Sequence, residues 1–495
     1  MVGRKVDRIW AAYISESDPK AKASLVQALE LLAVRHLDQG YQPDRSPFPP
    51  PPRELAGRGD VTLGQVTYAG KELFPFSLRA DRLKEHMLIC GRSGSGKTNL
   101  TFLLMRGLMA RGIHVLAMDW KRGYRDLLQV REDLRVYTIG REISPFRFNP
   151  FIPPPGIEAG HWGKLIVDVI ASAYFGGEGV ISLLVSGLDH LYHECGAHEG
   201  LVSRWPVVAD LLAWLRETKL TGRAAMWKAS AERILVAMTY GEFGAVLNCQ
   251  DNRDVRGLLN HNVVLEMDGL SSNSDRVLFS EALTLYLYRQ RLAEGPRDQL
   301  ANVIILEEAH NLLLGRQPGG RESVLENSIR MIRQYGLGYV FVDQSASMLS
   351  KVAFANSYAT VALSQKLKGD VQAMASAMNL ADEQRQALST LPIGSAVVRL
   401  ADEHPEPFLI QAPLCGIQEG LVGDDRAARS VPGDSGDSAS NTAAKSMPEE
   451  ITDLPPPDKK GISSMDPRDH RSHPPPESTT RSKEASPTHP PMNNP

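Results

Sequence analysis

The sequence predicts an α/β fold built around a mainly parallel sheet. Helical segments at 98–112 and 276–295 lie between apolar runs, and alternation of strand and helix is typical of this class. Most of the runs are continuous rather than alternating, as in strands buried on both faces of a parallel sheet. They cover residues 86–91, 114–119, 134–140, 262–269, 302–308 and 337–344.

The other elements follow in chain order. Residues 1–60 are predicted to hold a helix at 20–38 and a proline-rich linker at 46–53, because consecutive prolines cannot continue a helix. The main domain is expected at 61–415, and the tail at 416–495, rich in proline and without aromatic residues, is expected to be disordered. Within the main domain we expect a strand and turn at 61–70, a helical insertion at about 150–250 and a closing hairpin at 395–413.

Composition excludes several classes of protein. The 495 residues are 42% hydrophobic, which supports a sizeable core, and the net charge of −3 excludes a strongly basic surface for nucleic acid. Any DNA contact must therefore come from local clusters of basic residues. The four cysteines form no CxxC pair, and neither a signal peptide nor about 18 consecutive apolar residues is present. We expect a cytoplasmic protein without stable membrane insertion.

A phosphate-binding loop follows the first core strand. Residues 91–98, GRSGSGKT, fit the pattern GxxxxGK[ST] between a strand and a helix, so backbone N–H groups and the helix N-terminus can bind phosphate oxygens. Lys97 is expected to reach the β- and γ-phosphates, and the Thr98 hydroxyl to bind Mg²⁺. The expected cofactors are ATP and Mg²⁺, contacted by Gly91, Arg92, Ser93, Gly94, Ser95, Gly96, Lys97, Thr98 and Asn99.

Two glutamates end a later strand, NVIILEEAH (302–310). A phosphate-loop hydrolase needs a carboxylate near Mg²⁺ and a group that orients or deprotonates water. Glu307 fits the first role and Glu308 the second. The usual metal-side residue is aspartate, so Glu307 departs from the common pattern.

These motifs resemble the HerA/FtsK branch of RecA-like motor ATPases. The resemblance rests on the phosphate loop, the EEAH ending, His86 and the DWK at 119–121, with similar blocks at 61–98, 332–345 and 391–400. It implies a RecA-like ASCE P-loop core over 61–415 and a homo-hexamer. RFNPF (147–151) and the helical insertion also resemble the secretion and conjugation ATPases of the same superfamily.

The resemblance assigns further roles. Gln344 becomes the γ-phosphate sensor, and Arg333 a catalytic arginine finger inserted into the neighbouring subunit's site, supported by Arg330. Asp119 and Lys121 either line the site or belong to an ordinary strand–helix loop.

The expected function is that of an ATP-driven hexameric translocase or helicase on double-stranded DNA. The resemblance suggests a nuclease or effector partner in DNA processing or anti-phage defence. Candidate DNA-binding loops are 315–323, with Arg316 and Arg321, and 345–356, with Lys351. The alternatives are a secretion or conjugation ATPase that energises export, and a nucleotide-gated scaffold with little hydrolysis.

A histidine-rich stretch, HLYHECGAHEG (190–200), matches no common zinc pattern. We expect surface histidines at a helix end and no metal beyond Mg²⁺. The residues concerned are His190, His193, Cys195 and His198.

Overall fold

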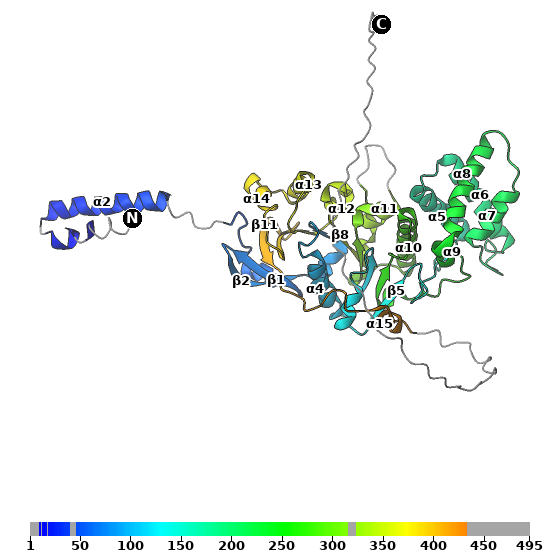
Figure 1. Cartoon of the computed structure of the whole chain (residues 1–495), viewed down its shortest axis with the longest axis horizontal. Coiled ribbons are helices and arrows are strands. Elements are labelled where there is room, and N and C mark those ends of the chain that lie inside the picture. Colours follow the sequence, from blue (N-terminus) through cyan, green and yellow to red (C-terminus); the bar gives the residue numbers. More distant parts are fainter. Residues whose placement is uncertain (1–8, 11, 17, 40–45, 315–322, 433–495) are drawn as a thin grey trace, which may run out of the picture. The chain divides into compact units, whose positions relative to one another are not determined.

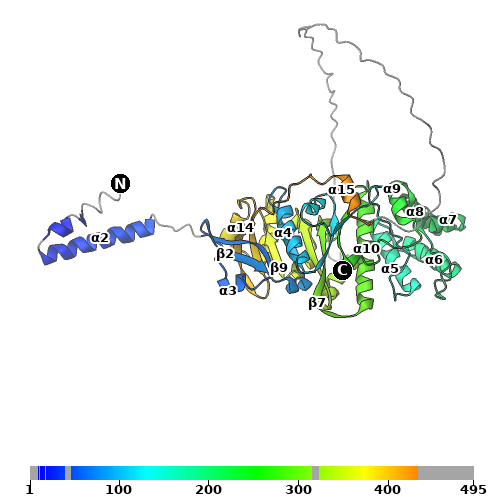
Figure 2. The same cartoon turned by 90° about the horizontal axis from the view of Figure 1, so that it is seen from below.

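The computed structural model of the chain describes residues 9–10, 12–16, 18–39, 46–314 and 323–432. Its centre is an 11-stranded sheet (Figures 1 and 2). The strand order is β2-β1-β11-β10-β9-β3-β8-β7-β4-β6-β5. The strands are β1 (Val61–Tyr68), β2 (Lys71–Leu78), β3 (Met87–Cys90), β4 (His114–Asp119), β5 (Leu134–Thr138), β6 (Asn262–Glu266), β7 (Arg297–Glu307), β8 (Tyr335–Asp343), β9 (Ala359–Ala362), β10 (Ser395–Leu400) and β11 (His404–Gln411).

Helices connect the strands and continue beyond the last one. In the described residues they are α2 (Pro19–Gln39), α3 (Arg53–Ala56), α4 (Lys97–Met109), α5 (Ala159–Ala173), α6 (Glu178–Glu194), α7 (Val208–Glu217), α8 (Arg223–Thr239), α9 (Gly241–Leu247), α10 (Asn273–Glu294), α11 (Val324–Met331), α12 (Lys351–Ala355), α13 (Lys368–Met378), α14 (Asp382–Ala387) and α15 (Asp424–Arg429). Among them, none is both long and apolar enough to span a lipid bilayer.

The central strands from β9 to β5 are all parallel, which confirms the predicted fold class. Alternate side chains along these strands pack into two hydrophobic cores, one on each face of the sheet. In β3, Leu88 and Cys90 join the core that contains α10, whereas Met87 and Ile89 join the core that contains α4. Both faces are covered, and this explains why these strands read as continuous apolar runs.

The rest of the sheet is antiparallel. β10 and β11 form the predicted closing hairpin, and β1 pairs with β11, so the first and last strands of the domain are neighbours. β9 was not predicted, because its four residues, ATVA, are too short to give a periodic signal.

The helical insertion lies between β5 and β6 in the sequence and comprises α5 to α9. Figure 1 shows these helices gathered beyond the β5 end of the sheet. Trp162 of α5 donates a hydrogen bond from Nε1 to the Pro150 carbonyl oxygen (2.8 Å), and Tyr192 of α6 donates from its hydroxyl to the Phe151 carbonyl oxygen (2.7 Å). The RFNPF segment therefore anchors the insertion to the core.

Two segments are more closely attached to the core than the sequence suggests. In the predicted linker, Phe48 is 1% exposed within the main core. In the predicted tail, residues 416–432 contain α15, which contacts β5, and the Ser430 hydroxyl accepts a hydrogen bond from Val136 N (2.9 Å). Charged contacts and main-chain bonds hold the second segment, so it has little apolar pattern to read. Residues 433–495 lie outside the described part of the chain.

Candidate nucleotide site

The phosphate loop joins β3 to α4 at the carboxyl edge of the sheet. Gly94 and Gly96 have φ of +72° and +104°, values that favour glycine. A Cβ atom on Gly91 would lie 2.6 Å from the Ser95 hydroxyl oxygen, so glycine is required there too. Ser95 Oγ is buried and has no hydrogen-bond partner within the described residues. This cradle of glycines beside an unsatisfied hydroxyl fits a bound phosphate group.

The Lys97 side chain folds back across the phosphate loop. Its Nζ donates to the carbonyl oxygens of Gly91 (2.6 Å) and Arg92 (3.1 Å). Burial lowers the pKa of Lys97, and the nearby Glu308 carboxylate opposes that effect. The ammonium group thus already lies inside the loop, where phosphate oxygens could replace the two carbonyl oxygens.

The two residues that follow Lys97 differ in what they contact. Thr98 lies in the first turn of α4 and is half-buried, and its predicted role as a Mg²⁺ ligand stays a prediction. The Asn99 side chain bonds to the chain beyond β11: its Nδ2 donates to the Pro413 carbonyl oxygen (2.8 Å), and its Oδ1 accepts from Cys415 N (2.9 Å). These two bonds engage both ends of the Asn99 amide group, and the predicted nucleotide contact of Asn99 stays a prediction. Asn99 thereby fixes the chain that leaves β11.

Glu308 is the centre of a polar cluster at the ends of three neighbouring strands. It follows β7 with a φ of +47° and is 9% exposed. Its Oε1 accepts hydrogen bonds from Lys121 Nζ, beyond β4, and from Gln344 Nε2, beyond β8. The structure thus brings Glu308 and Gln344 together, as the sequence predicts, and favours the alternative in which Lys121 lines the site.

Glu307 points to a different neighbour. Its Oε2 accepts from Trp120 N (3.2 Å), and its carboxyl group shares a hydrogen bond with Asp119. Burial and the adjacent Asp119 raise the pKa of Glu307 to about 9. The hydrogen bond between the two carboxyl groups therefore favours a shared proton, and the role of Glu307 as a Mg²⁺ ligand stays a prediction. Asp119 in turn accepts from the backbone N–H groups of Lys121 (2.8 Å) and Tyr124 (2.7 Å), which gives it a structural role.

Sequence reasoning missed two residues of the cluster, His310 and Asp343. Asp343 is 1% exposed and accepts hydrogen bonds from His310 N (2.6 Å) and Ser345 N (2.7 Å). It also contacts His310 Nδ1 (3.0 Å), and this hydrogen bond raises the pKa of His310. In the sequence, only their positions in EEAH and VDQ, next to Glu308 and Gln344, indicated that they could belong to the site. Glu308, His310 and Asp343 each offer a ligand atom within 4.8 Å of the others, so the site also has oxygen ligands suited to Mg²⁺.

Arg333 lies at the opposite edge of the sheet. It lies two residues before the start of β8, its side chain is 62% exposed, and its Nη2 forms an ion pair with Glu85 Oε1 (2.6 Å). β8 has nine residues, so at about 3.3 Å per residue its two ends are roughly 27 Å apart. Gln344 follows the far end. Arg333 therefore cannot reach the phosphate loop of its own subunit.

The two predicted DNA-binding loops have different outcomes. Arg316 and Arg321 lie outside the described residues. Lys351 is the first residue of α12, exposed to solvent, and Ser350 caps this short helix by accepting from Val352 N (3.2 Å).

Comparison with known proteins shows which families and folds this chain resembles. Residues 61–154 match the family described as helicase HerA, central domain. Protein TraC of Escherichia coli (strain K12) is 23% identical over 312 residues, which are 57% of this chain and 32% of TraC. The chain thus spans only about a third of that relative.

Two solved structures have a similar fold. VirB4 of Thermoanaerobacter pseudethanolicus is 15% identical, with a TM-score of 0.58, over 72% of this chain and 98% of VirB4. The plasmid coupling protein TrwB in complex with ADP and Mg²⁺ is 16% identical, with a TM-score of 0.54, over 76% of this chain and 97% of TrwB. The phosphate loop, the match of residues 61–154 to the HerA central domain and the fold shared with VirB4 and TrwB show that this chain has a RecA-like P-loop ATPase fold.

Proposed function

We propose that this chain hydrolyses ATP at sites shared between neighbouring subunits of a homo-hexameric ring and uses that energy to move double-stranded DNA. The observation that carries the proposal is the separation of Arg333 from its own phosphate loop by the length of β8. A solvent-exposed arginine on the far edge can complete only another subunit's site. A closed ring supplies every site with such an arginine.

The proposed chemistry follows from the cluster around Glu308. Bound Mg²⁺ would neutralise charge on the β- and γ-phosphates, held by Thr98 and the carboxylates beside it. Lys97 binds the same phosphates, and Glu308 orients the attacking water once its contacts with Lys121 and Gln344 rearrange around the nucleotide. Gln344 donates to the γ-phosphate and so reports its presence. The neighbour's Arg333 stabilises the charge that develops on the transferred group.

A second candidate function is that of a conjugation or secretion ATPase. The helical insertion and the likeness to TraC, VirB4 and the coupling protein TrwB favour it. In this case the ring would serve macromolecule export, and its partners would be components of an export system rather than a nuclease or effector.

ATPase measurements with and without double-stranded DNA test the proposal. We expect a hexamer by native mass spectrometry and ATP turnover that DNA stimulates several-fold. The Lys97→Ala variant should remain folded but hydrolyse nothing, which controls for contaminating ATPases. A hexamer whose turnover ignores DNA would support the export function instead. A chain that stays monomeric at micromolar concentration with ATP would refute the ring.

A further inference from the structure

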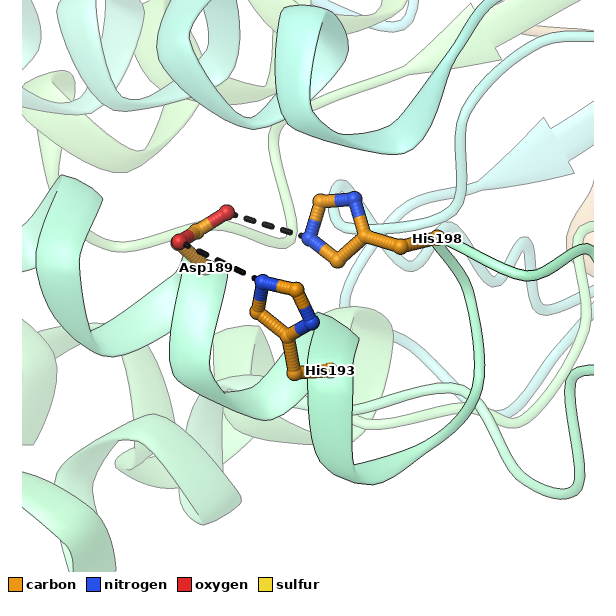
Figure 3. Close-up of side chains that lie close together, drawn as sticks. All are labelled: Asp189, His193 and His198. Carbon is orange, nitrogen blue, oxygen red and sulfur yellow. Dashed lines mark hydrogen bonds and ion pairs between the residues drawn. The ribbon is translucent and has the colours of Figure 1, made fainter.

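We propose that Asp189, His193 and His198 form a zinc-binding site at the end of α6 in the helical insertion (Figure 3). The histidine-rich stretch was expected to hold only surface histidines. The structure adds Asp189, which lies just before that stretch, and brings its carboxylate against two of the four residues considered. This cluster is separate from the nucleotide site, and the proposal is independent of the proposed motor function.

The three side chains converge because a helix turn and a tight loop bring them to one place. Asp189 and His193 are four residues apart on α6, so they lie on the same face. Gly196, with φ of +78°, ends the helix and reverses the chain, so that His198 returns beside that face. A Cβ atom on Gly196 would lie 2.6 Å from the Leu201 carbonyl oxygen, so this turn requires glycine.

The distances suit one small cation. Asp189 Oδ1 lies 3.1 Å from His198 Nε2, and Asp189 Oδ2 lies 3.9 Å from His193 Nε2. Figure 3 shows both Nε2 atoms directed at the same carboxylate. Ligand atoms around a tetrahedral zinc ion at about 2.0–2.1 Å are about 3.3–3.4 Å apart. Small rotations of the exposed His193 and Asp189 side chains would bring the three atoms to that separation.

His198 is already held in place. Its side chain is 19% exposed and packs edge-on against Tyr192, with ring centroids 6.2 Å apart. Its other ring nitrogen, Nδ1, lies 3.9 Å from Glu158 Oε1. A carboxylate behind a histidine ligand commonly fixes the ring and makes its metal-binding nitrogen more basic. Glu158 directly precedes α5, so a bound ion would connect the end of α6 to the start of α5.

The charge of the surroundings also favours a cation. The cluster lies at the C-terminal end of a 17-residue helix, where the aligned peptide dipoles give a partial negative charge. Asp189 and Glu158 add carboxylates. Two imidazoles and one carboxylate are typical ligands of Zn²⁺ and leave its fourth position for water.

Two other residues of the stretch point elsewhere and provide matched controls. His190 forms an ion pair with Glu194 (3.3 Å), one turn further along α6. Cys195 directs its Sγ to the Tyr192 carbonyl oxygen (3.5 Å), and burial raises the pKa of its thiol, which disfavours the metal-binding thiolate.

Zinc binding by the tag-free full-length protein, saturated with Mg²⁺ and ADP, tests the proposal. Equilibrium dialysis should show that His193→Ala and His198→Ala each weaken Zn²⁺ binding at least tenfold, whereas His190→Ala leaves it unchanged. Co²⁺ in place of Zn²⁺ should give the intense visible bands of a tetrahedral complex, and these should vanish in the same two variants.

Equal binding by the wild type and by His193→Ala would overturn the proposal. His193 is 61% exposed in its side chain, so this variant will fold, and circular dichroism checks that it does. Weak octahedral Co²⁺ spectra in the wild type would also refute the site, because they would indicate mostly water ligands.

Discussion

The position of Arg333 predicts that two inactive variants restore each other's activity. Arg333→Ala leaves the phosphate loop of its own subunit intact, because about 27 Å of β8 separates the two. Nucleotide affinity should therefore remain nearly normal. Turnover should fall by about 10³–10⁵-fold, the range that arginine fingers contribute in phosphoryl transfer. Lys97→Ala has the opposite defect: it loses phosphate binding but keeps its finger.

Mixed rings recreate complete sites. In an equal mixture, about half of the phosphate loops are intact, and about half of these face an intact Arg333 of the neighbour, so about a quarter of the interfaces are functional. Independent sites would then give about a quarter of wild-type turnover, against essentially none for either parent. ATPase assays on subunits mixed before ring assembly measure this recovery, and native mass spectrometry confirms that the rings are mixed. Confirmed mixed hexamers without any recovery would refute independent sites completed by a neighbour's Arg333.

Three further predictions concern the site and the chain ends. Glu308→Gln should bind ATP with near-normal affinity, but its rate of ATP hydrolysis in single-turnover assays should fall at least about 100-fold because the variant can no longer activate water. A normal rate would remove Glu308 from the mechanism. Glu307→Gln should make the fold more stable than wild type as pH rises. Burial raises the pKa of Glu307 to about 9 in the folded protein, so the folded wild type is fully stabilised by the neutral carboxyl group below pH 4.5. That stabilisation of the wild type is lost as pH rises through 9, whereas the neutral glutamine has no such loss. Melting temperatures of variant and wild type should therefore differ more at pH 9 than at pH 5, and a constant difference would contradict this. Deletion of 433–495 should leave the melting temperature unchanged, whereas deletion of 416–495 should lower it. Only the longer deletion removes α15 and the hydrogen bonds that join residues 416–432 to the core. Equal melting temperatures for the two deletion variants would show that residues 416–432 do not stabilise the fold.

The parallel part of the fold was predictable because burial on both faces leaves a strong mark in the sequence. Strands such as β4 and β6 have no exposed residue and appear as continuous apolar runs. The attachment of residues 416–432 was not predictable, because it depends on single polar contacts. Arg125 Nη1 binds Asp424 (2.7 Å), and the buried Asp126 accepts from Val422 N (3.0 Å). Such contacts join residues about 300 positions apart and have no periodicity.

For the site, the sequence predicts which residue types gather but not how their protons and contacts are arranged. The glycine pattern located the phosphate loop because strict spacing and backbone conformation both require those residues. The position of Glu307 predicts a metal ligand, but its hydrogen bond with Asp119, which ends the neighbouring strand, has no signal in the sequence. Asn99 follows the motif directly, yet the chain leaving β11 occupies both ends of its amide group. In each case the decisive partner comes from a distant part of the sequence.

One strand connects the two halves of the proposed catalytic machinery. β8 begins beside Arg333, which would act in the neighbour's site, and ends beside Asp343 and Gln344, which belong to the subunit's own site. Histidines hold this strand at its middle and at its carboxyl end: His86 Nδ1 accepts from Tyr339 N (3.1 Å), and Asp343 binds the His310 backbone and ring. Burial lowers the pKa of His86 to about 4, so its ring stays neutral and keeps the lone pair that this hydrogen bond needs. In the proposed ring, Gln344 and Arg333 flank this one strand, so a movement of Gln344 around a bound γ-phosphate would be transmitted along β8 to Arg333. If Arg333 acts in the neighbouring site as proposed, β8 would connect the nucleotide state of one site to the arginine that completes the next.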